Sequence, residues 1–114
     1  MNTMKNSVLL IGQLGTNPEI RKFDNSTKVH FRLATHDYYT NKEGEKTEKT
    51  EWHNIVAWGK LAENMDRFLQ KGQKVAIRGK LTHRQYEDKN GQTRDLTEIV
   101  TNDFELFSKS KIEA

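Results

Sequence analysis

The sequence contains no cysteine among its 114 residues. Without thiols the chain can form neither a disulfide framework nor a thiolate metal site, and this composition fits a reducing compartment. The opening residues, MNTMKNSVLLIGQLG, hold an apolar stretch too short for a signal peptide and lack the arginine-rich pattern of a transit peptide. We therefore expect a cytoplasmic protein.

Catalytic and metal-binding motifs are also missing. A metal site needs clustered ligands and a nucleophile needs a base beside it. The histidines form no HExxH pattern, the carboxylates are spread through polar segments, and no P-loop or GxGxxG motif follows an apolar run. We expect no enzymatic activity, no catalytic residue, no metal site and no cofactor.

What remains is a small, polar chain with patterned apolar residues. Its length fits one domain, and hydrophobic residues make up 33% of it while charged residues make up 31%. The apolar residues recur at regular spacings, which favours a folded domain with long polar loops over disorder. A formal net charge of +3 gives only a weak preference for an anionic partner and does not by itself indicate nucleic acid.

Strand patterns dominate the first third of the chain. Residues 7–15 are a compact apolar run that contains Gly12, a position typical of a bulge or bend. Residues 28–36 alternate between apolar and polar side chains, as expected for a half-buried strand. The apolar face of this second strand consists of Val29, Phe31 and Leu33.

The next segment is polar and then aromatic. Residues 37–50 carry both charge signs around Gly44 and no apolar side chain apart from two tyrosines, so we expect a long exposed hairpin loop. Alternation then returns and predicts a third strand up to Trp58. One face of this strand would carry Trp52, Asn54, Val56 and Trp58, and the other His53, Ile55 and Ala57.

One helical pattern follows, within residues 59–72. Its apolar residues have the spacing i, i+4, i+7 and i+8 and form one stripe, Leu61, Met65, Phe68 and Leu69. Gly72 is a natural stop for this helix.

Two further strands complete the pattern. Alternation returns with Val75, Ile77 and Leu81, and Asn90-Gly91 predicts the tip of a hairpin whose second strand runs to residue 107. The order of three strands, one helix and two strands is that of an all-β, five-stranded Greek-key OB-fold barrel with one α-helix between strands 3 and 4. We assign residues 1–107 to this domain and residues 108–114 to a short C-terminal tail.

The aromatic residues allow two interpretations. The tryptophans share their face with Asn54, a poor core companion, but also with Val56. Tyrosines also lie in both predicted hairpins, and large rings in exposed places require an explanation. Base stacking on such rings, in a groove lined by basic residues, contributes ~1 to 3 kcal/mol per base in single-strand binders. From the pattern alone, stacking and core packing both remain open.

Five segments resemble the bacterial single-stranded DNA-binding protein family. They are VLLIGQLGTNPEIR, FRLAT, TEWHNIVAWGKLAE, LQKGQKVAIRGKL and NGQTRDLTEIV, and they occur in the family's order between residues 4 and 107. The pair TEWH and GKLAE on one strand-helix unit is the most specific. The resemblance implies a homotetramer of OB folds around which single-stranded DNA wraps without sequence preference, in replication, recombination and repair.

The resemblance also implies roles for individual residues. It assigns base stacking to Tyr39, Trp52, Trp58 and Tyr86, contacts with DNA phosphates to Lys60, Lys71 and Arg84, and a subunit-interface position to His53. Residues 39 and 86 are tyrosine where the family often has tryptophan, and residue 58 is tryptophan where it often has phenylalanine. We therefore expect stacking of altered strength.

The end of the chain departs from the family. Members usually end in a flexible linker and an acidic tip that recruits replication and repair enzymes, whereas this sequence ends in FSKSKIEA. We expect no such recruitment here, and a cytoplasmic, nucleoid-associated location. Two alternatives are an RNA-binding OB-fold protein of the cold-shock kind, whose aromatic RNP motifs are missing, and a replication-restart interaction module.

Overall fold

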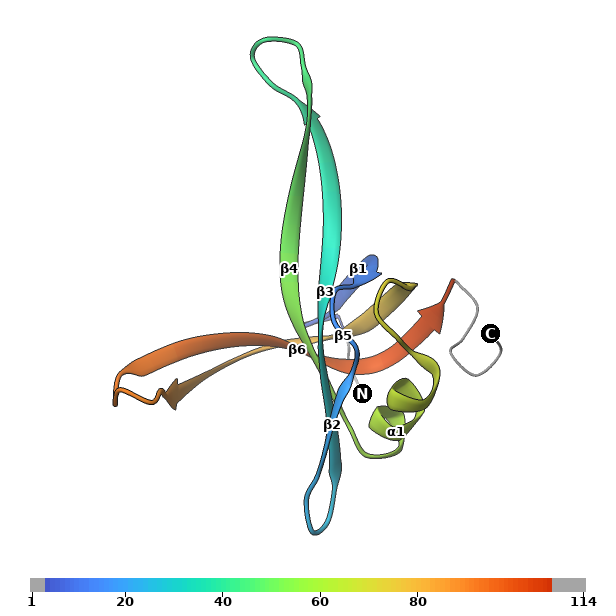
Figure 1. Ribbon diagram of the computed structural model, residues 1–114, viewed down its shortest axis with the longest axis vertical. Helices are drawn as coiled ribbons and strands as arrows, with labels where there is room; N and C mark the ends of the chain where they lie inside the picture. The colour runs from blue at the N-terminus through green and yellow to red at the C-terminus, as the bar shows by residue number, and fades with distance from the viewer. Residues whose placement is uncertain (1–3, 108–114) are drawn as a thin grey trace.

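The computed structural model describes residues 4–107 and contains six strands and one helix in that range (Figure 1). The strands are β1 (Val8–Leu14), β2 (Glu19–Lys22), β3 (Thr27–Thr40), β4 (Lys46–Trp58), β5 (Lys74–Glu87) and β6 (Thr93–Leu106), and the helix is α1 (Gly59–Phe68). The expected tail at residues 108–114 lies outside the described residues.

A closed barrel forms the centre of the molecule. The strands are ordered β1-β5-β6-β4-β3, and the pairing of Gln13 and Leu14 with Ala34 and Leu33 joins β1 to β3 and closes the ring. The pairing of β4 with β6 is parallel and the other pairings are antiparallel. The predicted OB-fold barrel is confirmed, with α1 between its third and fourth strands in chain order.

The barrel core follows the predicted alternation. Val29, Phe31 and Leu33 of β3 are completely buried, because one face of this strand points into the barrel. The helix adds its apolar side to the same cluster through Ala62, Met65 and the following Leu69. On β5, Val75 and Ile77 are buried as predicted, but Leu81 is exposed, because it lies two residues beyond Gly79, where the pairing of β5 with β1 ends.

The prediction of a long loop at residues 37–50 is wrong. These residues are mostly paired strand, since the register of β3 and β4 continues to Thr40 and Lys46 and leaves only residues 41–45 as a turn. The turn is closed by the side-chain oxygen of Asn41, which accepts hydrogen bonds from the backbone N–H groups of Glu43 and Glu45. A paired arm with two polar faces gives no apolar alternation, which is why the pattern resembled a loop.

A matching turn closes the second arm, between β5 and β6. The Asp88 carboxylate accepts hydrogen bonds from the backbone N–H groups of Asn90 and Gln92, and Gly91 has a positive φ of 77°. The predicted Asn90-Gly91 tip is therefore confirmed. Both arms project well away from the barrel in Figure 1, one upward and one to the left.

A short strand that the sequence analysis missed pairs along one edge of β3. This strand, β2, pairs with residues 27–30 of β3, whereas β1 pairs with residues 33 and 34 farther along. It forms the third, lower hairpin of Figure 1, next to α1. All four of its residues are exposed, so no buried face marked it in the sequence.

Candidate functional site

The two tryptophans lie on one face of β4 and are half exposed. Trp52 is 51% exposed and Trp58 is 45% exposed, whereas Val56, on the same face between them, is buried. The face is therefore covered at its centre and open at the two rings, which lie roughly 20 Å apart at the usual rise of a strand. Neither tryptophan belongs to the buried core.

Trp52 rests on the end of β1. Its ring lies so close to Gly15 that a Cβ atom on that residue would overlap ring atoms Cζ3 and Cη2. The guanidinium carbon of Arg32, on the neighbouring strand β3, lies 4.6 Å from the centroid of the ring, in the range of a cation–π contact. These contacts hold the ring in place while leaving half of it accessible.

Trp58 has a second aromatic residue beside it. The ring of Phe23, in the turn between β2 and β3, lies 6.1 Å from that of Trp58 between centroids, with 30° between the planes. Lys28 lies directly opposite Trp58 in the ladder, and its Nζ is 5.5 Å from the indole centroid. Phe23 is not among the predicted site residues, although an aromatic residue before the polar turn residues DNS is a visible signal in the sequence.

The register does not place Tyr39 with the tryptophans. Residues directly opposite each other in a ladder share a face, and successive residues alternate. Trp52 lies opposite Ala34, so the even-numbered residues of β3 are on the same face as Trp52. Tyr39, which lies opposite Thr47, is therefore on the other face. Tyr86 is on the second arm, opposite Arg94. The four predicted stacking residues thus lie on two faces of the β3–β4 ladder and on the second arm.

Of the two predicted phosphate-binding lysines, Lys60 is close to Trp58 along the chain, and Lys71 is linked to the segment on which Trp52 rests. Lys60 is exposed in the first turn of α1, two residues after Trp58. Lys71 is exposed in the loop after the helix, where its backbone N–H donates to the side-chain oxygen of Asn17, at 2.8 Å. Asn17 follows Gly15, on which Trp52 rests, by two residues.

Arg84 is the predicted basic residue with a strong internal partner. Its Nε donates to one carboxylate oxygen of Glu98 at 3.1 Å and its Nη2 to the other at 3.4 Å. The Glu98 side chain is only 8% exposed, whereas that of Arg84 is 49% exposed. The hydrogen bond with Glu98 raises the pKa of Arg84 further above its usual value. Part of the Arg84 charge is therefore already balanced by Glu98.

A cavity of about 280 Å³ connects the Trp58 region with the second arm. Its lining is mainly basic and polar, and consists of Glu19, Ile20, Arg21, Lys28, His30 and Arg84. Arg21, Lys28 and Trp58 form one cross-strand row, because Lys28 lies opposite both of the other residues. The cavity therefore opens beside Trp58 and ends at the strand that carries Tyr86.

His53 lies on β4, directly opposite Leu33 of β3. Its Nε2 is 2.9 Å from the hydroxyl oxygen of Thr35, and the residue is partly buried. Among residues 4–107, no group of three or more His, Asp or Glu side chains is arranged to hold a metal ion. No helix in the same range is long and apolar enough to span a membrane.

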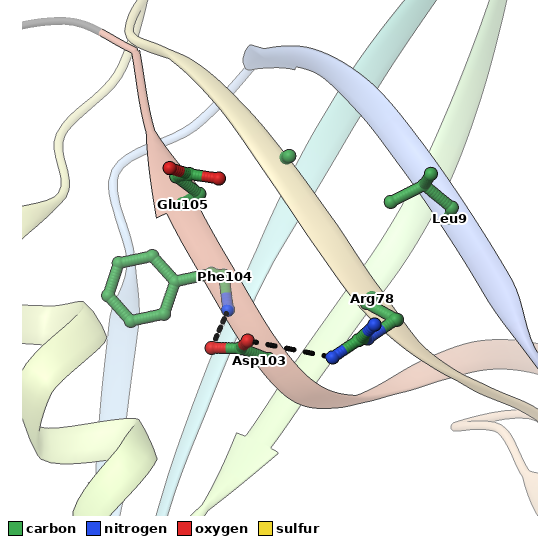
Figure 2. Close-up of a pocket in the computed structure, with 6 residues that line it drawn as sticks. Leu9, Arg78, Asp103, Phe104 and Glu105 are labelled. Atoms are coloured by element: carbon green, nitrogen blue, oxygen red, sulfur yellow. Dashed lines mark hydrogen bonds and ion pairs between the residues drawn. The ribbon is translucent and has the colours of Figure 1, made fainter. Parts of the chain in front are cut away.

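The outer face of β1 carries two exposed apolar side chains. Leu9 is 65% exposed and Ile11 is 50% exposed. Figure 2 shows Leu9 across β5 from Asp103 and Phe104, with Arg78 between them. An ion pair of 3.8 Å joins Arg78 to Asp103.

The chain belongs to the single-strand binding protein family, whose family model matches residues 5–107. It is 44% identical over 104 residues to Single-stranded DNA-binding protein 1 of Chlorobaculum tepidum, covering 90% of this chain and 64% of that protein. It is 43% identical over 106 residues to the Single-stranded DNA-binding protein of Bacteroides thetaiotaomicron, covering 90% of this chain and 66% of that protein. The chain thus spans just under two thirds of the length of these relatives.

Solved structures agree with the family assignment. The SSB of Plasmodium falciparum in complex with ssDNA superposes with a TM-score of 0.82 at 29% identity, covering 95% of this chain and all of that one. A deletion mutant of the single-stranded DNA binding protein from Thermus aquaticus superposes with a TM-score of 0.78 at 25% identity, covering 92% of this chain and 53% of that one. The predicted membership of this family is confirmed.

Proposed function

We propose that this chain binds single-stranded DNA without sequence preference and without catalysing a reaction on it. The observation that carries the proposal is the pair of half-exposed tryptophans on one face of β4, each with a cationic side chain at its ring. Single-strand binders combine such stacking rings with basic residues that follow the phosphates. The P. falciparum SSB, which has the same fold, is in complex with ssDNA.

The site residues follow from this proposal. Bases stack on Tyr39, Trp52, Trp58 and Tyr86, and Lys60, Lys71 and Arg84 contact phosphates. Because Tyr39 lies on the opposite face of the β3–β4 ladder from the tryptophans, a strand that reaches all four rings of one chain must pass from one face of this ladder to the other. Arg84 contributes less to DNA affinity than Lys60 does, because Glu98 balances part of the Arg84 charge.

The binding unit we propose is a homotetramer. Exposed Leu9 and Ile11 support an interface between copies, since apolar groups on the outer face of β1 are removed from water when a second copy covers them. His53 is then a position at a subunit interface. The tetramer would coat single strands in replication, recombination and repair, in the cytoplasm and associated with the nucleoid.

Mass measurement in solution, with and without poly(dT), tests the proposal. We expect a tetramer that combines with poly(dT) into a larger, saturable complex. A monomer would contradict the proposed tetramer, and a mass that poly(dT) leaves unchanged would contradict the proposed DNA binding. Competition between matched DNA and RNA oligonucleotides separates DNA binding from the cold-shock alternative. Weak affinity for poly(dT) would favour the interaction module.

A further inference from the structure

We propose that Phe23 is a further base-stacking residue, which forms with Trp58 a two-ring platform for one end of the bound strand. The inference rests on the proposed binding of single-stranded DNA. Phe23 remains 49% exposed and Trp58 45% exposed although their rings are in contact. The pair therefore presents a continuous aromatic surface to solvent, of the kind on which bases stack.

The local structure fixes Phe23 in this position. Its backbone N–H donates to the carbonyl oxygen of Ser26 at 2.8 Å, which closes the turn between β2 and β3. The residues that follow, Asp24 and Asn25, are exposed and polar, so the turn offers Phe23 no apolar cover of its own. An exposed phenylalanine held in a tight turn against a tryptophan loses little conformational freedom when a base stacks on it.

Charge next to the platform suits a nucleotide rather than an apolar ligand. Lys28 contacts the Trp58 ring and also lines the cavity, together with Arg21 and His30. Glu19 is the one carboxylate in that lining, so the basic side chains outnumber it. A base on the two rings would thus have its phosphate beside cationic groups, as in other single-strand binding grooves.

Substitution of Phe23 provides the first test, with Phe107 as a matched control. Phe107 is also an exposed phenylalanine, and Lys74 Nζ lies 5.9 Å from its ring, but it follows β6 and, among residues 4–107, is not in ring contact with a tryptophan. Binding is measured by anisotropy of a labelled dT oligonucleotide of about ten residues. We expect Phe23→Ala to weaken binding at least about fivefold, the equivalent of ~1 kcal/mol for one stacked base. We expect Phe107→Ala to leave binding unchanged.

A second set of variants separates direct stacking from support of Trp58. We expect Phe23→Tyr to bind like the unaltered chain, and Phe23→Leu, which keeps apolar area but loses the ring face, to bind weakly. In a Trp58→Ala background, Phe23→Ala should weaken binding again. If Phe23→Ala has no effect in that background, Phe23 acts only by positioning Trp58, and the inference is overturned.

The remaining outcomes distinguish this inference from the proposed function. Equal affinity of the unaltered chain and Phe23→Ala, with unchanged thermal midpoints, would overturn the inference and leave single-strand binding intact. Failure of the unaltered chain to bind the oligonucleotide would overturn both. A photo-cross-link from a 5-iodouracil oligonucleotide to the peptide containing Phe23 gives a direct readout, and we expect it to disappear in Phe23→Ala.

Discussion

The indole ring of Trp52 lies against the backbone of Gly15, at a spot where any side chain would overlap it. Arg32 approaches the same ring, with its guanidinium carbon 4.6 Å from the centroid. Gly15 is in turn held by its backbone N–H, which donates to the carbonyl oxygen of Arg32 at 2.7 Å. The ring is therefore positioned before any ligand arrives, which reduces the entropy lost on binding.

Gly15→Ala should weaken binding without unfolding the protein. The added methyl group displaces the Trp52 ring, which has room to move because half of it is exposed. We expect lower affinity for dT oligonucleotides and an unchanged thermal midpoint. Gly12→Ala is the comparison, since its methyl group would overlap the backbone oxygen of Ala34 in the barrel. That variant should lose about 1 to 3 kcal/mol of stability. Equal effects of the two variants on stability would contradict this account.

Replacing either tryptophan should cost affinity and spare the fold. Trp52→Ala and Trp58→Ala should each lose about 1 to 3 kcal/mol of binding free energy, the usual contribution of one stacked base. Neither ring is buried, so circular dichroism and thermal midpoints should change little. Variants that unfold would show that the rings are structural, and variants that bind normally would show that they are bystanders.

Lys60→Ala and Arg84→Ala should behave differently. Lys60→Ala removes an exposed cation, so affinity should fall for all sequences alike, and the log-log salt slope should flatten by roughly 0.7 for each phosphate that is no longer neutralised. Arg84→Ala leaves the buried Glu98 carboxylate without its ion pair, so it should also lower stability, by about 1 to 3 kcal/mol. A double variant Arg84→Ala/Glu98→Ala should recover part of that stability. Equal stability of Lys60→Ala and Arg84→Ala would be evidence against the pairing.

The turn at Asp88 should make stability depend on acid pH. Hydrogen bonding with Arg94, and then with the Gln92 backbone N–H, lowers the pKa of Asp88. A carboxyl group whose pKa is lower in the folded state stabilises the fold above its unfolded pKa, and loses this contribution as the pH falls through the folded value. Asp88→Asn keeps the turn geometry, as Asn41 does in the first arm, and does not titrate. The thermal midpoint of the unaltered protein should therefore fall toward that of Asp88→Asn below about pH 4. A difference between the two midpoints that stays constant down to about pH 2 would contradict this prediction.

The sequence predicted the elements that bury one face and missed those that do not. Val29, Phe31 and Leu33 alternate because the barrel has an inside, and that pattern located β3 correctly. The arm formed by residues 37–50 and the strand β2 are paired but bury no apolar face, so nothing in their composition separated them from loops.

The features of the site that could not be predicted from the sequence depend on contacts between residues far apart in the chain. The sequence identified the tryptophans, but it could not show whether they were core or exposed. Their strand face is mixed: Val56 is buried, while the rings on either side of it are half exposed. The face of Tyr39 follows only from the ladder register, and the pairing of Arg84 with Glu98 only from the alignment of β5 with β6. The contact of Phe23 with Trp58 joins a turn to the end of a strand far along the chain.

Tryptophan fluorescence during titration with dT oligonucleotides tests the central claim most directly. Both tryptophans of the chain are in the proposed site, so stacking of bases should quench their emission to saturation. We predict strong quenching by single-stranded DNA that weakens as salt is raised, and little quenching by a duplex of the same length. An unchanged emission spectrum at saturating single-stranded DNA, or equal quenching by the duplex, would contradict the account.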